Sequence, residues 1–181
     1  RGNTSMIMQF YGEKIKKEPE LAEMMEDINE SSERLIGIVN DFLDISRLEQ
    51  GKMVFKAKAF DLGEVINETI KSYQVTSSRS KLSLHYESSE VALPQVFADP
   101  DKTRQVLINL IGNGFKFTTE GGITIRAEKD GEFVIVRVKD TGRGISKENQ
   151  NLLFHKFQQA NTSLLTRDTT KGTGLGLYIS K

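Results

Sequence analysis

The sequence contains no cysteine and only two histidines. Without cysteine the chain forms no disulfide, carries no thiol nucleophile and builds no Cys-based zinc or iron–sulfur site. The histidines, His85 and His155, belong to no Asp/Glu/His cluster with metal-ligand spacing, which argues against a transition-metal enzyme. Basic and acidic residues balance at 25 each, so net charge gives no reason to expect a nucleic acid or an acidic membrane surface as partner.

Long apolar runs are missing too. No stretch of about 18 apolar residues and no signal-peptide pattern occurs, so we expect a soluble chain without direct membrane contact. The 181 residues are 37% hydrophobic, which is enough for one ordinary domain, or for one domain and a helical appendage.

Two helices are predicted in the first 50 residues. Residues 4–17 form a short amphipathic helix that ends before Pro19, because the residue preceding a proline disfavours the α conformation. From Glu20 to about Gln50 an apolar residue recurs every seven positions, at Leu21, Ile28, Leu35 and Phe42. Such a seam packs against other helices, which favours a four-helix bundle made by two chains. The alternative is that the seam covers the second domain of the same chain.

The rest of the chain is predicted to mix helices and strands. The first expected elements are a helix from the Asp61 cap to about Tyr73, a loop over Val75–Lys81, and strands over 82–86 and 96–97. A helix that begins at Asp99 and Pro100 follows. After it we expect a hairpin of strands over 123–128 and 132–138, and a helix from Ser146 to about Phe157. Residues 158–171 are predicted to form a long mobile loop before a final glycine-led helix.

The helix after Pro100 has a narrow polar strip on an otherwise apolar surface. The strip spans an arc of roughly 80°. Its members are Lys102, Gln105, Asn109, Asn113 and Lys116. Unpaired buried amides cost about 1–3 kcal/mol each, so the strip faces something polar. A bound polar ligand is one explanation, and neighbouring backbone or solvent at a helix edge is the other.

Three glycines, Gly172, Gly174 and Gly176, open the final helix. Each costs roughly 0.5–1 kcal/mol relative to alanine, so something must offset them. Bare glycines let backbone N–H groups approach a phosphate at a helix N-terminus. Close helix packing is the alternative, and it accounts best for Gly176. Neither the GxxxxGK[ST] loop nor the dinucleotide-binding turn is present.

Asp140 ends a buried-looking strand and begins the glycine-rich turn Asp140-Thr141-Gly142-Arg143-Gly144. It is either a turn-former or an acceptor for a ligand donor. The tripeptide Asp140-Thr141-Gly142 also occurs in aspartic proteases. That chemistry needs two carboxylates that share a proton, and the sequence has only one such tripeptide. The amides, the lysine, the carboxylate and the glycine-led helix, in this order, are what a nucleotide site needs.

Four segments resemble the sequence boxes of sensor histidine kinases. They are NLIGNGFKFT (N box), DTGRGI (G1 box), FHKF (F box) and GTGLGL (G2 box). ESSERLIGIVNDFLDISRLEQGK resembles the second helix of the family's dimerisation and histidine phosphotransfer domain. The resemblance implies an α+β chain: an N-terminal helical hairpin of a dimeric four-helix bundle over 1–52, then an ATP-binding α/β sandwich of Bergerat type over 53–181, with a mixed sheet and helices on one face.

The resemblance also implies roles for individual residues. Asn113 is expected to hold Mg²⁺, while Asn109 supports the metal and phosphates and Lys116 reaches phosphate; the last two are the expected catalytic residues. Phe117 is expected to lie on adenine and Asp140 to accept from its amine. The remaining expected nucleotide contacts are Gly142, Gly144 and Ile145 around adenine, and Thr173, Gly174, Leu175, Gly176 and Leu177 around the phosphates.

The implied function is to bind Mg-ATP and, in a full-length dimeric parent, to phosphorylate a histidine and then a response-regulator aspartate in the cytoplasm. Neither histidine lies in the family's phosphoacceptor motif, so we expect the chain to begin after that motif and to stop before the end of the catalytic domain. Asn109 stands where the superfamily's hydrolytic ATPases carry a glutamate. Because an amide takes no proton from water, hydrolysis should be slow. The alternative is a non-catalytic, nucleotide-regulated dimer module.

Overall fold

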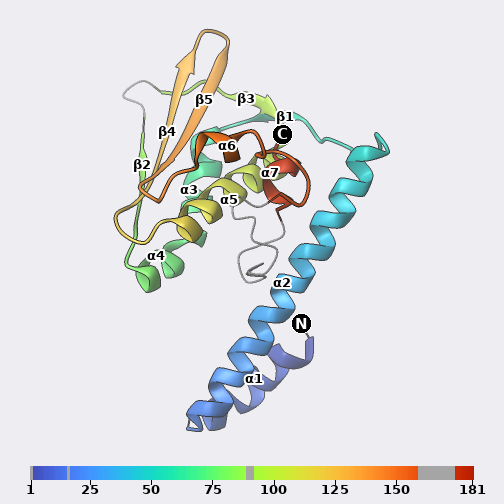
Figure 1. The fold of residues 1–181 in the computed structure, drawn as a ribbon, viewed down its shortest axis with the longest axis vertical. Helices are drawn as coiled ribbons and strands as arrows, with labels where there is room; N and C mark the ends of the chain where they lie inside the picture. The colour runs from blue at the N-terminus through green and yellow to red at the C-terminus, as the bar shows by residue number, and fades with distance from the viewer. Residues whose placement is uncertain (1, 16, 89–91, 159–173) are drawn as a thin grey trace. The chain divides into compact units, whose positions relative to one another are not determined.

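The computed structural model describes residues 2–15, 17–88, 92–158 and 174–181 (Figure 1). The chain divides into two compact units, Arg1–Met53 and Val54–Lys181. Most of the predicted loop over 158–171 lies outside the described residues, as do Gly172 and Thr173. Within the described ranges, no helix is both long enough and apolar enough to span a membrane.

The first unit consists of two helices, α1 (Gly2–Ile15) and α2 (Pro19–Glu49), which contact each other. Both were predicted from the sequence to within two residues. Pro19 occupies the first turn of α2, where its missing N–H removes no helical hydrogen bond. The heptad positions of α2 are exposed, from 45% at Leu21 to 62% at Leu35.

The second unit contains two small sheets. Strands β1 (Lys58–Phe60) and β3 (Val96–Ala98) pair antiparallel, and the sequence predicted no strand at β1. The larger sheet has the order β2-β4-β5, with bounds Ser83–Glu87, Gly122–Asp130 and Phe133–Asp140. Strand β4 runs parallel to β2 and antiparallel to β5, so the sheet is mixed as expected.

Helices α3 (Leu62–Ser72) and α5 (Pro100–Phe117) pack together and lie on one face of this sheet (Figure 1). Their apolar faces and strand β4 form the core. Its buried members are Leu62, Val65, Ile66, Leu107, Ile111, Ile125 and Ala127. This is the arrangement expected from helices with one apolar side packed on a sheet.

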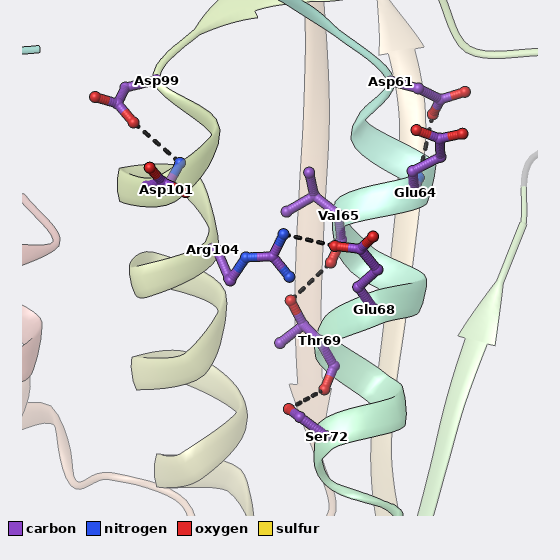
Figure 2. Close-up of polar contacts among 9 residues, drawn as sticks. All are labelled: Asp61, Glu64, Val65, Glu68, Thr69, Ser72, Asp99, Asp101 and Arg104. Atoms are coloured by element: carbon purple, nitrogen blue, oxygen red, sulfur yellow. Dashed lines mark hydrogen bonds and ion pairs between the residues drawn. The ribbon is translucent and has the colours of Figure 1, made fainter. Parts of the chain in front are cut away.

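Both helices begin at an aspartate cap. The Asp61 carboxylate accepts from the backbone N–H of Gly63 at 2.7 Å and of Glu64 at 3.3 Å, and Asp99 caps α5 in the same way. Figure 2 shows the two caps and the ion pair between Arg104 of α5 and Glu68 of α3, whose nitrogen and oxygen lie 2.6 Å apart. Two of the predicted helix starts are therefore observed, and the helices are also joined on their exposed side.

The loop predicted over Val75–Lys81 is instead a helix, α4 (Gln74–Ser80). Its serine hydroxyls bond to helix carbonyls: Ser78 Oγ donates to Gln74 O at 2.9 Å and Ser80 Oγ to Thr76 O at 2.8 Å. Serine favours loops because its side chain competes for backbone groups, but here its hydroxyls bond to carbonyls within the helix.

The helix predicted from Ser146 to Phe157 is also wrong in length. Helix α6 spans only Lys147–Gln150, capped as expected by Ser146, whose hydroxyl accepts from Asn149 N at 3.4 Å. Phe154 and Phe157 have φ values of 62° and 57°, in the left-handed region, so an α-helix cannot run through them. The last described helix is α7 (Gly176–Ile179).

Candidate functional site

Tyr73, at the end of α3, makes two contacts with helix α5, which carries the polar strip. The Tyr73 ring stacks on Phe115 with centroids 5.5 Å apart, and its hydroxyl donates to Ile108 O at 3.1 Å. Burial raises the pKa of Tyr73, so the hydroxyl stays protonated as a donor. Tyr73 therefore holds α5 through Phe115 and the backbone of Ile108, and not through a side chain of the polar strip.

The polar strip is half-buried over most of its length. Lys102, Gln105, Asn109 and Asn113 are partly covered, and Lys116 is exposed. At the N-terminal end, Lys102 Nζ donates to Gln105 Oε1 at 3.1 Å. The strip is thus neither fully buried nor a solvated surface, which is the condition for meeting a polar ligand at the edge of a core.

The two asparagines of the strip differ in their surroundings. Asn109 Nδ2 donates to Gly176 O and to Ser180 Oγ, each at 3.1 Å. Asn113 lies one turn later, and its side chain forms no hydrogen bond with any part of the chain that the structure describes. Groups of the chain itself thus satisfy the Asn109 amide, whereas the Asn113 amide can bind a ligand.

Gly174, just before α7, and Gly176, the first residue of α7, both lie close to atoms of other parts of the chain. A Cβ on Gly176 would lie 3.2 Å from Asn109 Cγ and Oδ1, so the glycine lets α7 approach α5. Gly174 has a φ of 72°, and a Cβ there would lie 2.8 Å from the backbone oxygen of Gln158. Packing was the expected alternative for Gly176, and the structure adds a steric reason for Gly174. Between and after them, Leu175 is buried and Leu177 half-buried.

Two cations flank Phe117 at the C-terminal end of α5. Lys116 Nζ lies 4.8 Å and the Arg143 guanidinium carbon 5.2 Å from the ring centroid. The Arg143 backbone N–H also donates to Phe117 O at 3.3 Å. These contacts bring the glycine-rich turn after β5 to the end of the strip. Sequence reasoning missed Arg143, and its only signal was its place between Gly142 and Gly144.

Asp140 forms the turn in which it lies. Its Oδ1 accepts from the Gly142 backbone N–H at 2.8 Å, so the turn-forming interpretation is observed. The expected buried end of the strand is wrong: Asp140 is exposed because β5 is an edge strand of the sheet. Gly144 and Ile145, which follow the turn, are exposed as well. Within the described residues, Asp140 Oδ2 has no hydrogen-bond partner.

Two family models match the chain. Residues 1–51 match the His Kinase A (phospho-acceptor) domain, and residues 98–181 match the histidine kinase-, DNA gyrase B- and HSP90-like ATPase. Both histidines of the chain, His85 and His155, lie outside residues 1–51. The order of the two matches is the order of the two units.

Curated relatives align with most of this chain. The circadian input-output histidine kinase CikA of Synechococcus elongatus is 37% identical over 161 residues, which cover 88% of this chain and 21% of the relative. Drug sensory protein A of Synechocystis is 37% identical over 182 residues, covering 94% of this chain and 26% of the relative. The chain therefore spans about a quarter or less of the length of these relatives.

The solved structures that resemble this chain include histidine kinases. Full-length ShkA in complex with AMPPNP matches with a TM-score of 0.73 and 28% identity, covering 88% of this chain and 32% of that one. The complex of histidine kinase ThkA with response regulator TrrA matches with 0.63 and 27%, covering 92% and 50%. A nucleotide-free ThkA catalytic domain is 32% identical with a TM-score of 0.58, covering 70% of this chain and 78% of the other. The chain belongs to the sensor histidine kinases.

Proposed function

We propose that this chain binds Mg-ATP in its second unit and that, within a longer dimeric protein, it transfers the γ-phosphoryl group to a histidine and then to a response-regulator aspartate. The observation that carries the proposal is the pair of α5 amides. Asn109 is tied to the start of α7, and Asn113, one turn further, has no described partner. The relative crystallised with AMPPNP supports the nucleotide, and the ThkA–TrrA complex supports the receiver domain as partner.

Asn113 fits a role in holding Mg²⁺. An amide oxygen is a hard ligand of the type that Mg²⁺ accepts, and this ion usually takes few protein ligands besides phosphates and water. A half-buried amide with no hydrogen-bond partner among the described residues suits such a site. The ion would neutralise charge on the phosphates, while Lys116 would contribute a positive charge from the same face of α5.

The turn after β5 is suited to adenine. Because Asp140 Oδ1 holds the Gly142 N–H, the carboxylate is fixed in place and Oδ2 can accept from an exocyclic amine. The Phe117 ring offers an apolar face beside it. Lys116 and Arg143 already lie over that ring, so adenine and at least one cation would share its surface. Gly144 and Ile145 follow the turn and are exposed, so they too could contact the base.

The proposed transfer breaks the bond between the γ-phosphorus and the bridging oxygen, so that ADP leaves and an imidazole nitrogen gains the phosphoryl group. Catalysis of this reaction is mostly positioning and electrostatic stabilisation. Residues 1–51 contain no histidine, so the acceptor must come from outside them. An amide at Asn109 cannot deprotonate water, which favours transfer over hydrolysis. Dimerisation through α1 and α2 and a cytoplasmic location belong to the same proposal.

The test is Mg-ATP affinity measured by isothermal titration calorimetry. We expect Asn113→Ala and Asp140→Ala each to weaken binding about ten- to a hundredfold, the loss of one charge-assisted contact. Asn67→Ala, which removes an exposed amide on α3, is the matched control and should leave the affinity unchanged. Equal affinity in all four proteins would refute the site. Radiolabel transfer from ATP to a separate histidine-containing bundle then distinguishes a kinase from a non-catalytic module, which would transfer none.

A further inference from the structure

Three polar groups form a closed hydrogen-bonded triangle where α7 meets α5. Asn109 Nδ2 donates to both Gly176 O and Ser180 Oγ at 3.1 Å, and Ser180 Oγ donates in turn to Gly176 O at 2.8 Å. The Ser180 backbone N–H donates to the same oxygen at 3.0 Å. The triangle joins residues that are 67 and 71 positions apart in the sequence. It is therefore a tertiary link and not a local turn.

The triangle fixes which way the Asn109 amide points. Gly176 O can only accept, so the amide group that faces it must be the NH₂ group; a reversed amide would set two oxygens against each other. Ser180 reinforces this orientation because its hydroxyl hydrogen is already used on Gly176 O, which leaves its lone pairs for Asn109. Among the described residues these bonds occupy the Asn109 NH₂ group and leave the side-chain oxygen Oδ1 for a cation or a water.

The link also sets the spacing between the two helices. Gly176 carries no Cβ, and an added one would lie 3.2 Å from Asn109 Cγ. Leu175, just before it, is 2% exposed and so anchors the start of α7 in the protein. The glycine-led backbone and the polar strip of α5 are thus held at one separation, with Ser180 completing the contact from the end of α7.

The geometry points to Ser180 as a positioning residue of the nucleotide site: through its hydroxyl it orients the Asn109 amide and holds the start of α7 against α5. This inference rests on the proposed function. Ser180 itself needs no contact with the nucleotide. Because the groups that it orders are those assigned to phosphates and metal, its loss should weaken binding of the triphosphate and spare binding of the nucleoside.

A matched pair of substitutions tests the hydroxyl alone. Ser180→Thr keeps the hydroxyl, and Ser180→Val has nearly the same shape without it. We expect Ser180→Val to bind Mg-ATP about three- to tenfold more weakly than wild type, the effect of one net hydrogen bond, and Ser180→Thr to retain most of the affinity. Adenosine, titrated by NMR, should bind all three proteins equally. Ser72→Ala also removes a hydroxyl bonded to a helix carbonyl but lies on α3, so it should bind Mg-ATP as wild type does.

Equal Mg-ATP affinity for the Thr and Val variants would overturn the role of Ser180, and so would a parallel loss of adenosine binding, which indicates general damage. If wild type itself binds no Mg-ATP, the proposed function fails instead. The side-chain NH₂ signals of Asn109 in nucleotide-free protein then decide the contact separately. A shift in Ser180→Val that Ser180→Thr does not show supports it, and unchanged signals overturn it.

Discussion

The two units of this chain use their apolar residues in opposite ways. Among the described residues, the first unit buries two hydrophobic side chains, Ile15 and Ile45, and the second unit buries ten, including Ile66, Ile111 and Ile123 with no exposed surface. The apolar seam of α2 is at the same time 45–62% exposed. The second unit is therefore stabilised by its own core, while the first presents an exposed apolar face of the kind that binds another surface.

The largest expected effect tests the core of the second unit. Ile111 is fully buried between α5 and the sheet, so Ile111→Ala removes apolar contacts and leaves a cavity. We expect a loss of about 2–5 kcal/mol in the free energy of unfolding, measured by urea denaturation. Val75→Ala, at a 65% exposed position of α4, is the control and should change it little. If Ile111→Ala and Val75→Ala lower the free energy of unfolding by the same amount, Ile111 does not lie in the core.

The next effect tests the exposed seam. In the proposed dimer Leu35 is buried against the partner, so Leu35→Ala should weaken association by about 1.5–3 kcal/mol per buried side chain. Sedimentation equilibrium of the full chain measures this as a shift towards monomer. Arg34→Ala, next to it on α2, serves as the control. A monomeric wild type at high concentration, or a Leu35→Ala dimer as tight as wild type, would contradict the comparison between the units.

A smaller effect depends on pH. Hydrogen bonds from the backbone N–H groups of Lys56 and Lys102 hold the pKa of the Asp99 carboxyl below its ordinary value of 3.8. A lowered pKa means that the stabilisation is complete above about pH 4 and is lost as the pH falls through the folded-state pKa. Urea midpoints between pH 5 and pH 2.5 should therefore fall more steeply for wild type than for Asp99→Asn, which caps without a charge. Parallel curves would show that the charge contributes nothing.

The smallest effect concerns the ion pair between Arg104 and Glu68 (Figure 2). Both side chains are partly exposed, so solvent screens their attraction and the pair should contribute about 0–1 kcal/mol. A double-mutant cycle with Arg104→Ala and Glu68→Ala measures the coupling, which should vanish in 1 M salt because the Debye length falls to about 3 Å. A coupling free energy that stays the same in 1 M salt would contradict the prediction that solvent and ions screen this pair.

Elements with a local signal could be predicted from the sequence. Asp61 and Asp99 were identified as caps because an aspartate before an apolar periodic stretch satisfies free N–H groups, and both caps are observed. Helix α2 was predicted from its heptads. The sensor histidine kinase family was recognised from four short boxes in the correct order, and the family models agree.

Features that depend on distant partners could not be predicted. Strand β1 exists because residues 58–60 pair with residues 96–98. A segment of three residues carries no sequence pattern that would predict this pairing. The serines of α4 indicated a loop because the sequence does not reveal that their hydroxyls bond to carbonyls of the same helix. The link between Asn109 and Ser180 joins residues 71 positions apart, so no sequence pattern indicated that Asn109 is bound to the chain while Asn113 has no partner among the described residues.

The parallel pairing of β2 with β4 has a consequence for how the chain is made. Ser83 pairs with Gly122, so the sheet cannot close until the residues between them have left the ribosome. The backbone hydrogen bonds of helix α2 join residues close in sequence and can form as it emerges, whereas α3 and β2 must wait for α5 and β4 to pack and pair. During synthesis the apolar side of α3 therefore stays uncovered until α5 and β4 have emerged.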